Sequence, residues 1–384
     1  MEEFPFSSSL DLSNLNKMLS YEQLYEVKKH ILPELLENGY KGYFGKICVI
    51  GGNEIYSGAP FLSALTTLRL GADLCFVVSS KECSTHLKNY SPELIVYPYL
   101  YTNKFPKEKN NYKDLENCVK YLSNRIDSCV IGPGLGNIDK ETENCLKYII
   151  DIFIKSNIFL ILDADIIQFI ITNTYLFNLV KNYKNCIFTP NKNEFKKMIY
   201  FLTEKKNIQF NNLYTNQIIL YGHEIIKLFN GPKILIKDSN DIFISKNLFF
   251  ISSIQNQSFK RLAGLGDILT GLLAVFLAWG SKKKEALLPE IKDKFLISDL
   301  CEYHEYLDAI STFNASYLLK YICKETFKTF HIGMIATDVI NNIPLYFQQI
   351  YCDQPKKTDE SIESSKWIKR KTASLSTTNK QIFK

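Results

Sequence analysis

The amino-acid sequence predicts an α/β protein with a doubly wound, mostly parallel sheet and helices on both faces. Continuous apolar runs such as "LCFVV" and "FLIL" are typical of strands that are buried on both faces of a parallel sheet. Turns and helical patterns follow these runs, and that alternation is typical of sheets with crossover helices. One late stretch, "DIFISKNLFFIS", has the pattern of a hairpin, which predicts an antiparallel edge.

The first β-α-β unit is expected between residues 46 and 78. The run "KICVIGG" (Lys46–Gly52) predicts a strand that ends in two glycines. A helix is expected next, with Ser57 as N-cap, Pro60 in the first turn and Gly71 just beyond its end. Leu74–Val78 then predicts the second strand, parallel to the first.

The same alternation continues along the chain. Ser128–Gly136 predicts a strand that runs into a glycine loop, and Cys186–Met198 predicts a strand, a Pro turn and a helix. Strands are also expected in Ile158–Asp165 and Lys233–Lys237, and the hairpin in Asp241–Ser252. Further helices are expected at Glu141–Ile154, Ala309–Thr329 and Met334–Phe347. We expect one catalytic domain over residues 21–350, in which 281–307 is a charged insertion between two late helices. Flexible ends are expected at 1–20 and 351–384.

Composition and charge narrow the classes of function. The net charge is +6, and the tail from Tyr351 to Lys384 holds eight Lys/Arg against four Asp/Glu, so the rest of the chain is close to neutral. A basic surface for nucleic acid is therefore not expected. The ten cysteines form no CxxC pair and the five histidines are scattered, so no zinc site is expected. The N-terminus does not resemble a secretory signal, and we expected no membrane span. These features predict a reducing, cytoplasmic location, with import into an organelle left open.

The stretch "AGLGD" (Ala263–Asp267) carries the strongest chemical signal. Amides of Gly264–Gly266 at the start of a helix could form an anion-binding nest that stabilises charge on a transferring phosphoryl group. A carboxylate beside a phosphate needs a reason, and Asp267 could serve as the base that deprotonates an attacking hydroxyl. The alternative is that Asp267 is a helix N-cap after a glycine turn.

Other polar segments also follow expected strands. In "TPNKNEF", Asn191 and Glu194 could hold Mg²⁺ through water, or they could form a capping box. In "GPGLG", Gly134 and Gly136 would let the backbone approach a substrate, unless this is a plain loop. In "LDAD", Asp163 and Asp165 could contact a metal or ribose, or they could be solvated loop acids.

The expected strand ends share one edge of the sheet, where ligands of doubly wound sheets bind. The segment "GGNEIYSGAP" lacks the glycine spacing of a Rossmann fingerprint, and the chain has no Walker A lysine motif. Phosphoryl transfer would therefore use a different architecture.

Taken together, these segments resemble the ribokinase-like superfamily and, within it, the ATP-dependent NAD(P)H-hydrate dehydratases. The resemblance rests on "GKICVIGGNEIYSGAPFLSALTTLRLGADL", "VIGPGLG", "LILDAD", "TPNKNEF", "LIKDSNDIFIS" and "GLGDILTGLLA", between about Gly42 and Phe347. It implies a substrate site formed by Ala59, Gly134, Gly136, Asn191, Lys192, Asn193, Glu194, Phe195, Lys196, Lys197 and Asp267. It implies an ATP site formed by Lys237, Asp238, Ser239, Asn240, Asp241, Gln257, Ser258, Phe259, Lys260, Arg261, Leu262, Ala263, Gly264, Leu265 and Gly266. Gly264, Gly266 and Asp267 would be the catalytic group.

The resemblance also implies a reaction. ATP would phosphorylate the hydroxyl of hydrated NADH or NADPH with the help of Mg²⁺, and phosphate would then leave to regenerate the dihydronicotinamide ring. About 40 residues precede the matched region, too few for an epimerase domain, so a separate epimerase is the implied functional partner. A homo-oligomer stays open. Asp238 and Leu265 depart from the family pattern, which has glycine and a more polar residue at these positions. The alternatives are a vitamin or sugar kinase of the same fold and an inactive nucleotide-binding module.

Overall fold

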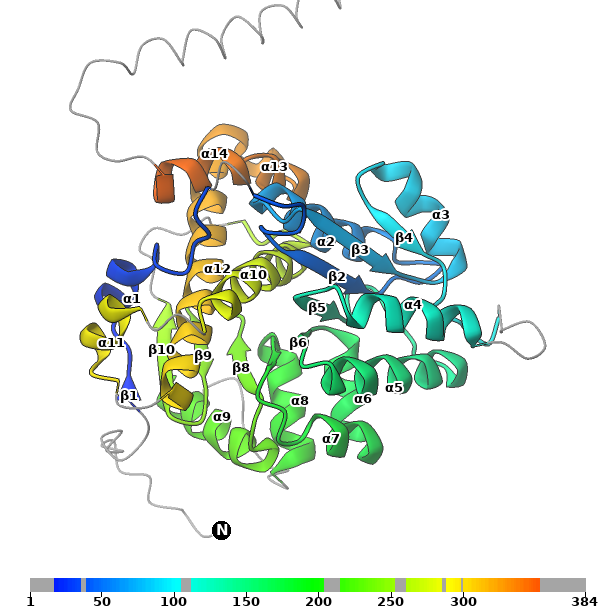
Figure 1. Cartoon of the computed structure of the whole chain (residues 1–384), viewed down its shortest axis with the longest axis horizontal. Coiled ribbons are helices and arrows are strands. Elements are labelled where there is room, and N and C mark those ends of the chain that lie inside the picture. The colour runs from blue at the N-terminus through cyan, green and yellow to red at the C-terminus, as the bar shows by residue number, and fades with distance from the viewer. Residues whose placement is uncertain are drawn as a thin grey trace, which may run out of the picture. The chain divides into compact units, whose positions relative to one another are not determined.

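A ten-stranded sheet forms the centre of the protein, as the computed structural model shows (Figure 1). The structure describes residues 17–35, 39–104, 112–203, 215–252, 260–284, 288–297 and 300–352. The strands are β1 (Lys17–Met18), β2 (Lys46–Ile50), β3 (Leu74–Val78), β4 (Ile95–Tyr97), β5 (Ser128–Ile131), β6 (Phe159–Leu162), β7 (Cys186–Phe188), β8 (Lys233–Ile236), β9 (Asp241–Ile244) and β10 (Leu248–Ser252).

The strand order is β1-β10-β9-β8-β7-β6-β5-β2-β3-β4. Strands from β8 to β4 in this order run parallel to their neighbours, whereas β9 is antiparallel to both β8 and β10. The expected hairpin at the edge is therefore confirmed. The order reverses between β5 and β2, which is the type of switch point where such sheets bind ligands.

Helices cover both faces of the sheet. They are α1 (Tyr21–Val27), α2 (Gly58–Leu70), α3 (Lys81–Tyr90), α4 (Lys113–Ser123), α5 (Lys140–Lys155), α6 (Asp165–Thr172), α7 (Thr174–Val180), α8 (Lys192–Leu202), α9 (Thr215–Phe229), α10 (Leu265–Lys282), α11 (Pro289–Phe295), α12 (Leu300–Phe330), α13 (Ala336–Asn341) and α14 (Ile343–Phe347). Helices α4 to α9 pack on one face, where their apolar residues form a buried cluster with the strands. Helices α2, α10 and α12 pack together on the other face.

The first β-α-β unit forms where it was expected. Pro60 lies in the first turn of α2, and Gly71 ends the helix with φ of 125°, a conformation that side-chain-bearing residues rarely adopt. Ser57 is the N-cap position, but its side chain makes no capping hydrogen bond. The predicted position of the N-cap is therefore confirmed, but the predicted capping by the serine side chain is wrong.

The late helices differ from the expectation. Helix α12 begins at Leu300 rather than Ala309, and the segment 281–307 holds the end of α10, helix α11 and the first turns of α12. This segment is therefore part of the helical layer and not an insertion between helices. The charges of this segment look solvated in the sequence, but Lys284 is mostly buried and pairs with Asp308 of α12.

The sequence predicts no segment that is long and apolar enough to span a membrane, and helix α10 departs from that expectation. By length and composition alone it could cross a membrane, but 72% of it is buried inside the protein. It packs against α2 and α12, so its apolar residues are accounted for by the core.

The described chain begins before the expected boundary. Lys17 and Met18 form β1 beside β10, and Ser20 caps α1 through a capping box with Gln23, so the expectation of a flexible end up to residue 20 was wrong for these residues. The expected basic tail covers residues 351–384, and all of it after residue 352 lies outside the described part of the chain. The chain divides into two units, with the boundary between Tyr346 and Phe347.

Candidate active site

The expected chemical segments follow parallel strands that are neighbours in the sheet. Strands β2, β5, β6, β7 and β8 lie side by side in the order β2-β5-β6-β7-β8. Their carboxyl ends therefore meet at one edge, and the loops that follow them form the floor of the candidate site.

The loops after β2 and β5 are bound to each other. The Gly52 amide donates to the Pro133 carbonyl at 2.9 Å, and the Asn53 side chain donates to the Leu135 carbonyl at 2.9 Å. The side-chain oxygen Oδ1 of Asn53 also accepts from the amides of Ile55 and Tyr56, both at 2.8 Å. Asn53 thus fixes the shape of the loop that leads to α2.

Glycine is required where the loop after β5 passes the end of β6. A Cβ at Gly132 would lie 1.7 Å from the Asp163 carbonyl oxygen, and Gly132 has φ of 132°. Gly136 continues this loop and donates its amide to Asp165 at 2.8 Å. The loop is therefore held in a constrained conformation next to the end of β6, and its contact with substrate stays a prediction.

The two acids of "LDAD" have different environments. Asp165 is exposed and is the first residue of α6. Asp163 is buried, with 2% of its surface exposed, and it forms an ion pair with Lys237. The Thr189 hydroxyl donates to the same oxygen of Asp163 at 2.8 Å. The interpretation of both acids as solvated is therefore wrong for Asp163, which joins the ends of β6, β7 and β8.

Lys237 is the positive charge at the centre of this cluster. Burial lowers the pKa of Lys237, but the charges of Asp163, Glu194 and Asp267 raise it by more, so the pKa lies above its ordinary value. The ammonium therefore stays charged at neutral pH. Lys237 is the positive group that faces the carboxylates of Asp163, Glu194 and Asp267.

Asp267 lies in the first turn of α10, whose N-cap is Gly264. The alternative in which Asp267 is itself the N-cap is therefore rejected. Burial raises the pKa of Asp267 to about 7, with a further increase from Asp163 and a partial decrease from Lys237. A carboxylate with a pKa near neutrality can both accept and return a proton at physiological pH, as a general base requires.

Gly266 places the start of α10 directly over the buried ion pair. A Cβ at Gly266 would lie 3.4 Å from the Lys237 ammonium and 3.9 Å from the carboxylate of Asp163. The expected anion nest thus lies next to a buried lysine, and both attract negative charge.

Gly264 and α2 hold this helix start in place. Gly264 has φ of 91°, and a Cβ there would lie 2.5 Å from the Leu62 side chain on α2. About two turns further along α10, a Cβ at Gly271 would lie 2.5 Å from the Ser63 carbonyl oxygen. Helices α10 and α2 therefore approach closely along their length, which fixes the nest relative to the loop after β2.

The start of α8 forms the capping box that was one of the two alternatives. The Asn191 side chain accepts from the amides of Asn193 and Glu194 at 2.9 and 3.0 Å, and Glu194 accepts from the Asn191 amide at 2.9 Å. Burial raises the pKa of Glu194, Lys237 partly offsets this, and Asp163 adds to it. The role of this pair in holding Mg²⁺ stays a prediction.

The charge balance of the site suits a cation. The carboxylates of Asp163, Glu194 and Asp267 lie near the ammonium of Lys237, and carboxylate oxygens are ligands that Mg²⁺ prefers. Within the described residues, no group of three or more His, Cys, Asp and Glu side chains is arranged to hold a metal directly. A cation held mainly through water and phosphate oxygens fits both observations.

Comparison with known proteins gives the family. Residues 47–344 match the family model described as NAD(P)H-hydrate dehydratase. The chain is 32% identical over 323 residues to the ATP-dependent (S)-NAD(P)H-hydrate dehydratase of Entamoeba histolytica, which covers 84% of this chain and 93% of that protein. The chain belongs to the NAD(P)H-hydrate dehydratase family. The enzyme of the same name from Batrachochytrium dendrobatidis is 29% identical and is matched over 86% of this chain and 98% of its own length.

Solved structures confirm the ribokinase-like fold. A ribokinase-like superfamily protein from Enterococcus faecalis superposes with a TM-score of 0.60 at 21% identity, covering 88% of this chain and 97% of its own. An ADP/ATP-dependent NAD(P)H-hydrate dehydratase from Bacillus subtilis, co-crystallised with ATP/Mg²⁺, superposes with a TM-score of 0.56 at 17% identity, covering 85% and 97%.

The positions that the resemblance assigns to substrate differ in how far their side chains are exposed. Ala59, at the start of α2, is half-buried, and Lys192, Asn193, Lys196 and Lys197 are exposed on α8. Phe195 is only 3% exposed and packs in the apolar cluster. The Phe195 side chain is therefore turned to the core, and any contact of this position with substrate would have to come from its backbone.

The family positions after β8 are held by side chains that the resemblance did not include. Lys320 on α12 donates to the Ser239 carbonyl at 2.9 Å and pairs with Asp241 at 3.0 Å. Asp241 is 4% exposed and also accepts from the Asp238 amide at 3.0 Å. The side chain of Asp241 therefore stabilises this turn, and its implied contact with ATP stays a prediction. Ser239 and Asn240 are exposed at the turn.

Asp238 and Leu265, the two residues that depart from the family pattern, lie in different parts of the structure. Asp238 pairs with Lys192 at 2.7 Å, so a position that the family resemblance implies for ATP is joined to one that it implies for substrate. Leu265 is half-buried as the first residue of α10.

The remaining ATP positions precede α10. Lys260 donates to the Met334 carbonyl at 2.7 Å, which ties this segment to the chain before α13. Arg261 and Ala263 are exposed, and Leu262 is half-buried. Gln257, Ser258 and Phe259 lie outside the described residues.

Asn53, Thr189 and Lys320 are the organising residues that sequence reasoning missed. Each acts by a hydrogen bond to a residue far away in the sequence. Asn53 stood within a quoted motif, where its place between two glycine loops could have been a signal.

Proposed function

We propose that the protein repairs hydrated nicotinamide cofactors by ATP-dependent dehydration of (6S)-NADHX and (6S)-NADPHX, returning NADH and NADPH. Membership of the NAD(P)H-hydrate dehydratase family supports the reaction class, which makes the protein a lyase. The observation that carries the mechanism is the half-buried Asp267, with a pKa of about 7, beside Lys237 and the glycine-bounded start of α10.

In the first step, Asp267 accepts the proton of the substrate hydroxyl as the oxygen attacks the γ-phosphorus of ATP. The bond between the γ-phosphorus and the bridging oxygen breaks, and ADP leaves with that oxygen. The amides of Gly264–Gly266 and the Lys237 ammonium stabilise the negative charge that develops on the transferring group. The product of this step is a phosphate ester of the hydrated ring.

In the second step, the lone pair of the ring nitrogen expels the phosphate, which leaves with the electrons of the carbon–oxygen bond. Loss of a proton from the adjacent ring carbon then restores the double bond of the dihydronicotinamide. Phosphate is a far better leaving group than hydroxide, so a site built for phosphoryl transfer can drive a dehydration. The net reaction converts ATP and the hydrate into ADP, phosphate, the reduced cofactor and a proton.

Mg²⁺ belongs to this proposal as a cation that neutralises the phosphate oxygens. Glu194 would hold it through water, and the excess of carboxylates around Lys237 supports this choice. The side-chain oxygen of Asn191 already accepts two backbone hydrogen bonds, so we assign the main role in binding the hydrated Mg²⁺ to Glu194. A separate epimerase would supply the (6S) form, and the cytoplasm is the proposed location.

The test is recovery of dihydronicotinamide absorbance after hydrated NADH or NADPH is mixed with the protein and Mg²⁺. Parallel reactions contain ATP, ADP or no nucleotide. Recovery with ATP supports the proposal, and the ADP reaction defines the nucleotide preference. A stable phosphorylated product without recovery of absorbance would replace the dehydratase with a small-molecule kinase.

A further inference from the structure

A cavity of about 580 Å³ opens at the edge of the sheet opposite to the candidate active site. Its lining includes Asp127, Phe159, Asn185, Lys284 and His304, and we call it the basal cavity. Phe159 is the first residue of β6, and the other end of β6 leads to Asp163. The strand therefore runs from the basal cavity to the site, and the two are separate places in the fold. The volume lies within the usual range of small-molecule sites, about 300–1,000 Å³.

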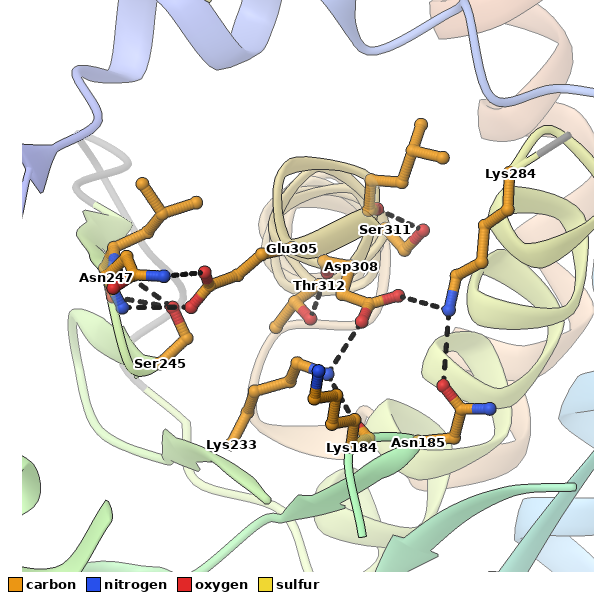
Figure 2. A network of polar contacts seen from close by, with 12 residues as sticks. Lys184, Asn185, Lys233, Ser245, Asn247, Lys284, Glu305, Asp308, Ser311 and Thr312 are labelled. Carbon is orange, nitrogen blue, oxygen red and sulfur yellow. Dashed lines mark hydrogen bonds and ion pairs between the residues drawn. The ribbon is translucent and has the colours of Figure 1, made fainter. Parts of the chain in front are cut away.

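Positive charge gathers under this cavity. Lys233, at the start of β8, and Lys284, after α10, both pair with the single carboxylate of Asp308 on α12, at 2.7 and 3.6 Å. Figure 2 shows the two ammonium groups approaching Asp308 from different sides. All three side chains are mostly buried, with exposed fractions of 8%, 15% and 4%.

The neighbouring charges do not remove this excess. Asp127 pairs with Lys282 at 3.5 Å and accepts from the Lys46 amide at 2.8 Å, so its charge is already opposed. Burial lowers the pKa of His304, and Lys284 lowers it further, so the imidazole is neutral at pH 7. Three lysines thus face two carboxylates, and one buried positive charge is left in surplus.

Both lysines are held in place by further contacts, and Lys284 lines the cavity. Lys233 donates to the Lys184 carbonyl, and Lys284 donates to the side chain of Asn185 at 3.3 Å. Both ammonium groups also lie over the ring of Phe159, at 5.5 and 5.7 Å from its centroid. A buried cation in surplus is costly unless an anion or water compensates it, and these contacts fix where an anion would have to bind.

The lining supplies groups of the right kind for such an anion. Ser156 and Asn157 contribute a hydroxyl and a side-chain amide that can donate hydrogen bonds, in addition to the Lys284 ammonium. We propose that the basal cavity is a second binding site that takes a small organic anion with phosphate or carboxylate groups, held by Lys284. This site does not depend on the proposed reaction.

The test is isothermal titration of the full chain with pyrophosphate and, separately, with citrate. Saturating ADP is present throughout so that the nucleotide site is filled. The wild-type protein is expected to bind one equivalent of at least one probe. Tighter binding of pyrophosphate assigns the site to phosphorylated compounds, and tighter binding of citrate assigns it to polycarboxylates.

Three variants locate the binding. Lys284→Gln removes the surplus charge while leaving the Lys233–Asp308 pair, and it should raise the Kd at least about tenfold. Lys284→Arg keeps the charge and should retain affinity within about threefold. Lys328→Gln removes an exposed lysine on α12 that pairs with Glu325, and it should have no effect.

Thermal unfolding of each variant shows whether it is folded. Absence of binding by the wild-type protein would overturn the proposal. So would equal affinity in the wild type and a folded Lys284→Gln variant, because the anion would then bind elsewhere. Neither result would bear on the dehydratase reaction, which is measured by absorbance recovery.

Discussion

Asp267→Asn should make the protein more stable at pH 8 while it removes the catalytic base. The pKa of Asp267 is raised from its ordinary value of 3.8 to about 7, mainly by burial. A carboxyl group with a raised pKa in the folded state contributes its full share of stability below the unfolded pKa. That share is lost as the pH rises through the folded pKa, because the folded protein must then hold a buried anion.

The size of the effect follows from the same shift. About three pKa units correspond to about 4 kcal/mol between pH 4 and pH 8, at about 1.4 kcal/mol per unit. Asp267 is only half-buried, so solvent screening reduces this value, and we expect a gain of about 1–2 kcal/mol for Asp267→Asn at pH 8. At pH 5.5 the expected gain is roughly half as large.

The assay is urea unfolding of wild type and Asp267→Asn at pH 5.5 and pH 8. Asp114→Asn is the matched control, because Asp114 also lies in the first turn of a helix, α4, but is exposed. Loss of that charge should lower the free energy of unfolding by less than about 1 kcal/mol at both pH values. If Asp267→Asn is no more stable than wild type at pH 8, the carboxylate is not desolvated and the reasoning about its pKa is wrong.

Four further predictions concern catalysis and packing at the same edge of the sheet. The value of kcat/KM should rise about tenfold between pH 6 and pH 8, because ionisation of Asp267 around pH 7 creates the base; a flat profile would exclude this titration. Asp163→Asn should move that profile to lower pH, because Asp163 raises the pKa of Asp267 and opposes Lys237, and an unchanged midpoint would contradict the coupling. Gly264→Ala should lower the melting temperature more than Gly266→Ala, since a Cβ at Gly264 meets Leu62 at 2.5 Å whereas one at Gly266 has ordinary contacts, and equal melting temperatures would contradict the geometry. Gly266→Val should still lose turnover, because its branches reach toward Lys237, and normal turnover would separate the nest from the phosphate.

Local patterns predicted most of the sheet. The strands at Lys46–Ile50 and Leu74–Val78 are long apolar runs, and their burial on both faces is what makes such runs recognisable. The short strands β1 and β4 went unpredicted, because two or three residues carry too little pattern. The start of α12 was missed for another reason, since charged residues such as Asp308 look solvated until their buried partners are known.

The candidate site was predictable in position but not in its internal contacts. Strand ends and glycine motifs indicated Asp267, Gly136 and Glu194 at one edge of the sheet. The ion pair between Asp163 and Lys237 joins β6 to β8 across the intervening β7, over 74 positions of sequence. The spacing of residues along the sequence cannot predict a contact over such a distance. This ion pair places the charges of Asp163 and Lys237 next to Asp267, where they shift its pKa.

The central claim is that Asp267 is the base of an ATP-dependent dehydration. Its most direct test is the initial rate of absorbance recovery from (6S)-NADHX with ATP and Mg²⁺, for wild type and for Asp267→Asn with ATP binding confirmed. We expect recovery with the wild type and a rate at least about 10³-fold lower with the variant. A variant that recovers absorbance at the wild-type rate would contradict the account.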